Sequence, residues 1–115
     1  MKNYKGPGEN VTRVAPYDVV TGGGLQVGQL FGVAVNDALN TKPVVMSTTG
    51  TYELVKLAAQ AWTVGQLIYW DNVNKRCTNA TATGLLLIGS AEEVAANPSA
   101  TGIVRLNGAA AAAQP

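Results

Sequence analysis

The sequence contains no histidine and only one cysteine, Cys77, among its 115 residues. Without histidine the chain lacks the commonest general base, the commonest metal ligand and every nucleophile that depends on a histidine partner. One cysteine can neither close an intrachain disulfide nor complete a zinc site, and we interpret Cys77 as a half-buried strand residue. We therefore predict that the protein is not an enzyme and that it holds no metal and no cofactor.

The chain also lacks an excess of charge of either sign, because it has eight Lys and Arg residues and seven Asp and Glu residues. A chain without a positive field has little to attract nucleic acid or an anionic membrane. Long apolar runs are absent both near the N-terminus, where a signal peptide would need one, and at the length of a membrane span. The sequence predicts no nucleic-acid partner, no membrane contact and synthesis in a cytoplasm.

Two local patterns resemble parts of catalytic or ligand-binding sites, but neither has all the residues that such a site needs. The adjacent carboxylates Glu92 and Glu93 would point to opposite sides of a strand, or about 100° apart on a helix, so the pair is not suited to joint acid–base work. The glycine run 22–24 resembles the start of a phosphate-binding loop, but the Lys and the hydroxyl residue that such a loop needs do not follow. We interpret the run as a turn and predict that nucleotides are neither bound nor hydrolysed.

Thirteen glycines and five prolines are spread through the chain, and the segments between them are short and rich in Val, Ile, Leu, Thr and Tyr. This punctuation is typical of short strands joined by turns. The predicted fold is all-β, a small single-domain β-barrel or β-sandwich of short antiparallel strands with little helix. The predicted strands are Val11–Ala15, Tyr17–Thr21, Leu25–Val27, Leu30–Val35, Val44–Thr48, Thr51–Val55, Leu67–Asp71, Arg76–Asn79, Leu85–Ser90 and Gly102–Leu106.

Local signals predict how some of these segments are joined. The clearest hairpin joins 67–70 to 75–78 through 71–74, where Asn and Asp side chains can bond the turn backbone. At 53–61, where helix competes with strand, we predict strand to Val55 and then a loop or a single turn. A short helical turn is predicted at 91–96.

The sequence Val-Gly-Gln-Leu occurs twice, at 27–30 and again at 64–67. Each copy stands just before a predicted apolar strand. We predict that the glycine of each copy turns the chain so that the strand can enter the core.

The termini differ from the middle of the chain, and we predict three parts: a flexible arm at 1–8, a single β domain at 9–108 and a disordered Ala-rich tail at 109–115. The arm carries Lys2, Tyr4 and Lys5. An arm with one aromatic side chain and two cations can add a strand to a partner's exposed sheet edge. The alternative is a frayed terminus without a function.

Three predicted strands, 30–35, 67–70 and 85–88, are apolar throughout instead of alternating with polar residues. Each would place large apolar side chains on both of its faces. Either another subunit covers the outer face, or the loops of a two-sheet fold cover it. The candidate residues for an interface with a partner protein or another subunit are Lys2, Tyr4, Lys5, Trp62, Tyr69, Trp70, Leu86 and Ile88.

Four aromatic residues cluster late in the chain. They could form a stacking platform for sugars, or they could be anchors of the core and of an interface. The residues are Tyr52, Trp62, Tyr69 and Trp70.

The sequence resembles the small head-decoration, or capsid-cement, proteins of tailed bacteriophages. The order and spacing of short segments carry the resemblance, which departs from the family pattern in the tail, Ala109–Ala113. Related sequences are often labelled as RecA/RadA-like recombinases, a label that the missing phosphate loop argues against. The segments are Met1–Tyr4, Gly6–Gly8, Val14–Tyr17, Leu30–Ala34, Gly50–Leu54, Ala61–Gln66, Ile68–Asp71, Leu87–Gly89 and Val104–Gly108.

The resemblance implies a mostly β protein that binds the outer surface of an icosahedral phage head and stabilises the expanded shell. It implies two partners, the major capsid protein and further copies of the chain itself, with a homotrimer preferred. It also implies a place in the virion after synthesis in the bacterial host's cytoplasm. The alternative hypothesis is a small carbohydrate-binding or adhesion module displayed on a phage or host surface.

Overall fold

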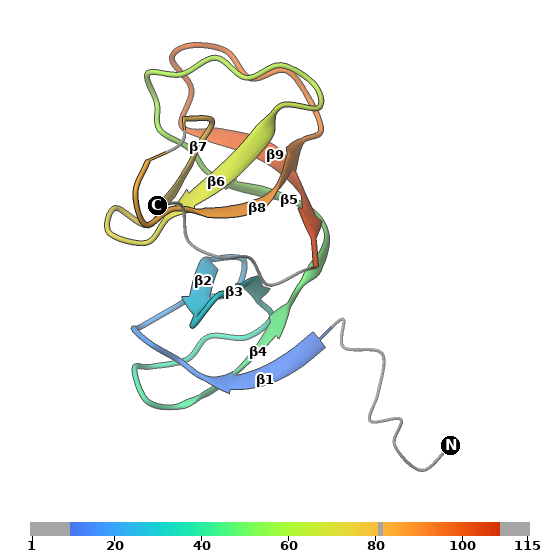
Figure 1. Cartoon of the computed structure of the whole chain (residues 1–115). Coiled ribbons are helices and arrows are strands. Elements are labelled where there is room, and N and C mark those ends of the chain that lie inside the picture. The colour runs from blue at the N-terminus through green and yellow to red at the C-terminus, as the bar shows by residue number, and fades with distance from the viewer. Residues whose placement is uncertain (1–9, 81, 109–115) are drawn as a thin grey trace.

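The computed structural model of the chain describes residues 10–80 and 82–108. Within these residues the chain forms strands and turns and no helix, which confirms the predicted all-β fold (Figure 1). No helical segment of the described part has the length and apolarity needed to cross a lipid bilayer. The strands are β1 (Asn10–Val14), β2 (Gly24–Val27), β3 (Leu30–Ala34), β4 (Pro43–Ser47), β5 (Thr49–Val55), β6 (Leu67–Asp71), β7 (Arg76–Thr78), β8 (Leu86–Ala91) and β9 (Thr101–Asn107).

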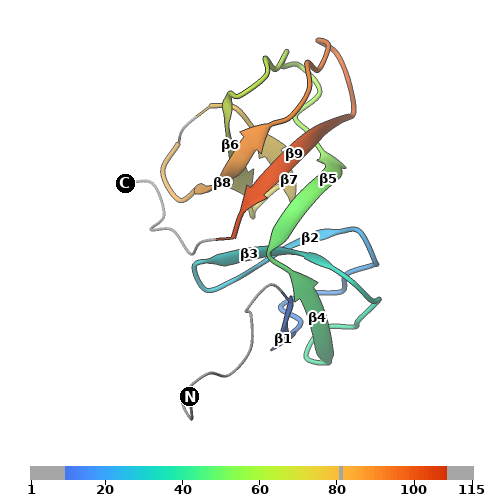
Figure 2. The same ribbon diagram turned by 90° about the vertical axis from the view of Figure 1, so that its right-hand side faces the viewer.

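The strands form two antiparallel sheets that follow one another along the chain. The first four strands make a small sheet in the order β1-β4-β3-β2, and the last five make a larger sheet in the order β5-β9-β8-β6-β7. The larger sheet curls into a half-barrel, because the residue after β5, Lys56, bridges to Cys77 in the opposite edge strand β7. Only Thr48 separates β4 from β5, so these two strands connect the sheets almost directly (Figure 2).

Strand β3 contributes to two cores. Phe31 and Val33 point into the core of the half-barrel, where the Phe31 ring lies 4.9 Å from the Trp70 ring. Leu30 and Ala34 point the other way, into the smaller core of the four-stranded sheet. Both apolar faces of this strand are therefore buried within one chain, which is the two-sheet alternative that the sequence left open.

One predicted strand, Tyr17–Thr21, is wrong. Only Val19 in this segment makes a strand-like contact, an isolated bridge in which its backbone exchanges two hydrogen bonds of 2.9 Å with Ala38. The Asp37 carboxylate accepts a 2.7 Å hydrogen bond from the N–H of Thr21. A side chain, and not the backbone of a neighbouring strand, therefore bonds this N–H. The segment is a loop that is held at both ends.

The helical turn predicted at 91–96 is also wrong. Ala91 is the last residue of β8. Ala95 forms a bridge with Trp62, in which the two backbones exchange hydrogen bonds of 2.9 and 3.1 Å. Pairing with the distant 62 loop satisfies the backbone groups that a helical turn would have used within the segment.

The local predictions on turns are confirmed. The β6–β7 hairpin closes at Asp71 and Arg76, which lie opposite each other. Strand β5 ends at Val55 and a loop follows. Gly28 and Gly65, the glycines of the two Val-Gly-Gln-Leu sequences, have φ of 63° and 82°, a backbone region that favours glycine. The predicted arm at 1–8 and tail at 109–115 lie outside the described residues.

Candidate functional site

Five of the candidate interface residues lie in the interior of the chain. Their side chains are almost fully buried, with exposed fractions of 0% for Trp62, 7% for Tyr69, 2% for Trp70, 1% for Leu86 and 2% for Ile88. These positions give a partner almost no surface to contact. Any interface on these strands has to use neighbouring residues whose side chains point outward.

The N-terminal candidates are not placed, because Lys2, Tyr4 and Lys5 fall outside the described residues. The strand that follows them, β1, pairs with β4 alone among the described strands, so it is an edge of the small sheet. Its side chains are mostly exposed, and the Thr12 carbonyl accepts a 3.0 Å hydrogen bond from the Arg13 guanidinium. This edge is available for strand addition.

The aromatic residues do not form an open platform. The indole N–H of Trp62 donates to Gln60 and that of Trp70 donates to Asn72, so both rings are fixed inside the fold. A Cβ atom on Gly102 would come 2.3 Å from the Trp62 ring, which shows how closely the chain covers it. Sugar stacking needs an exposed ring face, and these two rings do not offer one.

Burial raises the pKa of two side chains that pack in the two cores, Cys77 and Tyr17. Burial raises the pKa of the Cys77 thiol to about 12, so this thiol stays protonated at neutral pH. Burial also raises the pKa of Tyr17 to about 12, and the Tyr17 hydroxyl donates a 2.8 Å hydrogen bond to the Gly24 carbonyl. No three His, Cys, Asp or Glu side chains come together anywhere in the described part of the chain.

Two loops of the small sheet present a surface that we call the loop-pair patch, made of Asp18, Val20, Asp37 and Leu39. Next to the patch residues, Val19 and Ala38 bridge the two loops and point into the smaller core. In an antiparallel pair the neighbouring residues point to the opposite face. The four patch side chains therefore point outward, and they surround a hollow of about 330 Å³.

Reciprocal hydrogen bonds hold the loop-pair patch in place. The Asp18 carboxylate in the first loop accepts a 2.7 Å bond from the N–H of Asn40 in the second. The Asp37 carboxylate in the second loop accepts a 2.7 Å bond from the N–H of Thr21 in the first. Together with the two backbone bonds of the Val19 bridge, these bonds hold the two loops against each other.

The loop-pair patch exposes two branched apolar side chains, Val20 with 67% and Leu39 with 65% of its surface in contact with solvent. The register places Val20 opposite Asp37 and Leu39 opposite Asp18, so apolar and acidic groups alternate across the patch. This surface was not predicted from the sequence. A signal was present in the shared pattern of an Asp followed by two apolar residues, at 18–20 and at 37–39.

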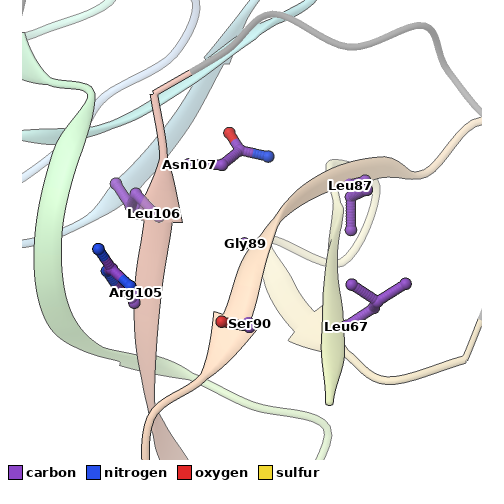
Figure 3. Close-up of a pocket in the computed structure, with 7 residues that line it drawn as sticks. All are labelled: Leu67, Leu87, Gly89, Ser90, Arg105, Leu106 and Asn107. Carbon is purple, nitrogen blue, oxygen red and sulfur yellow. The ribbon is translucent and has the colours of Figure 1, made fainter. Parts of the chain in front are cut away.

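A second surface lies on the half-barrel, and we call it the sheet groove. It has a volume of about 350 Å³ and runs between β6 and β9, with Gly89 and Ser90 of β8 between them. Figure 3 shows Leu67 and Leu87 on one side and the strand that carries Arg105 and Asn107 on the other. Leu67 has 53% of its surface exposed, and Leu87 is half-buried. This groove combines an apolar side with a cationic rim.

Comparison with known proteins gives one match. The model of a family described as phage cement protein matches residues 5–106, which include the loop-pair patch and, apart from Asn107, both sheets and the lining of the sheet groove. Neither a curated protein nor a solved structure was found to match the chain.

Proposed function

The chain belongs to the phage cement protein family, and on this premise we propose that it is a structural decoration protein that binds the outer surface of a phage head. Its partner is the major capsid protein. It is made in the cytoplasm of the bacterial host and remains in the virion on the capsid surface.

The mechanism we propose is stabilisation by binding. A protein that binds the expanded shell and not its precursor stabilises the expanded state by mass action. Many copies on one shell add their contributions, and a copy that touches two capsomers gains from multivalency. Such a protein needs surfaces that are formed before binding, because ordering them on the shell would weaken the contact.

The single observation that carries the proposal is the family match over residues 5–106. The edge strand β1 supports it, because its outer edge has no neighbour among the described strands and is open to a partner. We further propose that the chain forms a homo-oligomer, with a trimer preferred because decoration proteins of this kind commonly occupy three-fold positions.

The test is binding of the purified protein to expanded, undecorated shells, with unexpanded shells as the matched control. We expect the protein to sediment with expanded shells only and to raise the temperature at which those shells rupture. No binding to expanded shells, together with binding on a glycan array, would favour a carbohydrate-binding module instead.

A further inference from the structure

The loop-pair patch lacks partners for its most exposed groups. Asp18 and Asp37 each use the oxygen Oδ1 to hold the opposite loop, and the oxygen Oδ2 of each accepts no hydrogen bond from a described residue. Val20 and Leu39 are about two thirds exposed beside them. A surface that complements this patch has to supply apolar side chains and at least one cation.

The sheet groove supplies both. Leu67 and Leu87 are its apolar side, and Arg105 is exposed on the β9 side. No described residue makes a hydrogen bond or an ion pair with the Arg105 side chain. Glu53, which the register places diagonally across from Arg105, accepts a 2.8 Å hydrogen bond from the hydroxyl of Thr101 through its oxygen Oε2.

We propose that the loop-pair patch of one copy packs against the sheet groove of the next copy. Val20 and Leu39 then meet Leu67 and Leu87, and a patch carboxylate meets the Arg105 guanidinium, which is the residue best suited to pair with a carboxylate. This proposal takes the trimeric state from the proposed function. It adds which two surfaces form the contact between copies.

The geometry of the contact follows from where the two surfaces lie. The patch belongs to loops of the small sheet and the groove to the half-barrel, so they occupy different parts of the molecule (Figure 1). Each copy therefore uses a different surface toward each of its two neighbours. Such a heterologous contact closes into a ring when its rotation allows, and a ring of three copies is the trimer proposed above.

The experiment uses two single substitutions in the full chain. Leu39→Asp alters the patch and Leu67→Asp alters the groove, both at exposed side chains whose replacement leaves the cores intact. Val73→Asp, at the 88% exposed tip of the β6–β7 hairpin and outside both surfaces, is the matched control. We expect the parent and the control to be oligomers by analytical ultracentrifugation, and each patch or groove variant to dissociate at least about tenfold more readily.

Mixing the two variants gives the sharper test. The Leu39→Asp copy keeps an intact groove and the Leu67→Asp copy keeps an intact patch, so an equimolar mixture is expected to form a dimer with one of each and nothing larger. An interface that used the same surface on both copies would be weakened by only one of the two substitutions, so the other variant would still assemble with itself.

Three results would overturn the proposal: a parent that stays monomeric at tens of micromolar, variants that assemble as the parent does, or a mixture without the heterodimer. Binding to expanded shells is measured in parallel. Variants that still assemble but no longer bind shells would mean that these surfaces face the capsid. A parent that assembles as expected but does not bind shells would contradict the proposed function and leave the subunit contact standing.

Discussion

At the scale of single residues, the structure contains a lysine in an unusual position. Lys56 is only 3% exposed, and its ammonium group donates hydrogen bonds to the carbonyls of Leu57 at 2.8 Å and Ser99 at 3.3 Å. The same group lies 5.7 Å from the centre of the Trp62 ring. Burial lowers the pKa of Lys56. Carbonyl dipoles and a ring face therefore hold this charge, and in doing so they join two loops at one end of the half-barrel.

Asp71 is the residue whose charge we expect to matter most for stability. Its carboxylate accepts a hydrogen bond from the Asn74 side chain at 2.8 Å, and it also accepts bonds from the N–H groups of Val73 and Asn74. The Asn74 side-chain bond is the largest cause that lowers the pKa of Asp71, and burial acts in the opposite direction. A lowered pKa in the folded state means that the ionised form stabilises the fold.

The prediction is that Asp71→Asn lowers the free energy of unfolding by about 1 kcal/mol at neutral pH. Because the folded pKa lies below the ordinary value of 3.8, the stabilisation is present above that value. It is lost as the pH falls through the lowered folded pKa. Urea unfolding from neutral to strongly acidic pH is the measurement, with the exposed Glu93→Gln as control. If the difference in unfolding free energy between Asp71→Asn and the parent does not change with pH, the loss of stability comes from the shape of the side chain and not from its charge.

At the scale of the elements, β1 is the strand most open to a partner. It pairs with β4 on one side, and its other edge has no neighbour among the described strands. Residues 1–9 lead directly into it. We propose that this N-terminal segment grips the capsid, with Tyr4 filling a pocket and Lys2 and Lys5 meeting acidic groups.

The prediction is that deleting Met1–Lys5, with a new initiator Met, weakens binding to expanded shells at least tenfold, a loss of about 1.4 kcal/mol. The truncated protein should keep its circular dichroism spectrum and its oligomeric state. A variant with the order of residues 2–5 permuted separates a specific contact from a general effect of charge. Unchanged binding after the deletion would assign the grip to the folded body.

At the scale of the whole molecule, the two sheets depend on each other through β3. The Phe31 side chain extends from the small sheet into the half-barrel core, where the planes of its ring and the Trp70 ring form an angle of 50°. Neither sheet buries this side chain alone. We therefore expect the two sheets to unfold together in one cooperative transition.

The prediction is that Phe31→Ala lowers the free energy of unfolding by about 3 kcal/mol or more, because it leaves a cavity between the sheets. Tryptophan fluorescence follows the half-barrel, which holds Trp62 and Trp70, and far-UV circular dichroism follows both sheets. The two urea curves of the parent should coincide. Val14→Ala, at a 61% exposed side chain of β1, is expected to change little. Two separate transitions in the parent would contradict the expected cooperativity.

Features that depend on bonds within a few residues could be predicted from the amino-acid sequence. The hairpin at 67–78 was predictable because Asp71 closes the turn onto residues two and three positions away. The turns at Gly28 and Gly65 were predictable because only glycine readily adopts their backbone angles. Glycine and proline punctuation between short strand-forming segments was enough for the all-β fold. The order and spacing of particular short segments carried the family resemblance, which the match over residues 5–106 confirms.

Which apolar faces are buried and which remain exposed depends on how the two sheets fold together. Nothing local distinguishes the buried Leu86 and Ile88 from the exposed Leu67, because the difference arises from how the half-barrel curls. The loop-pair patch depends on a bridge between Val19 and Ala38, and so on backbone pairing between segments far apart in the sequence. Such pairing depends on the closure of the whole chain, and this is why the exposed surface could not be read from sequence pattern alone.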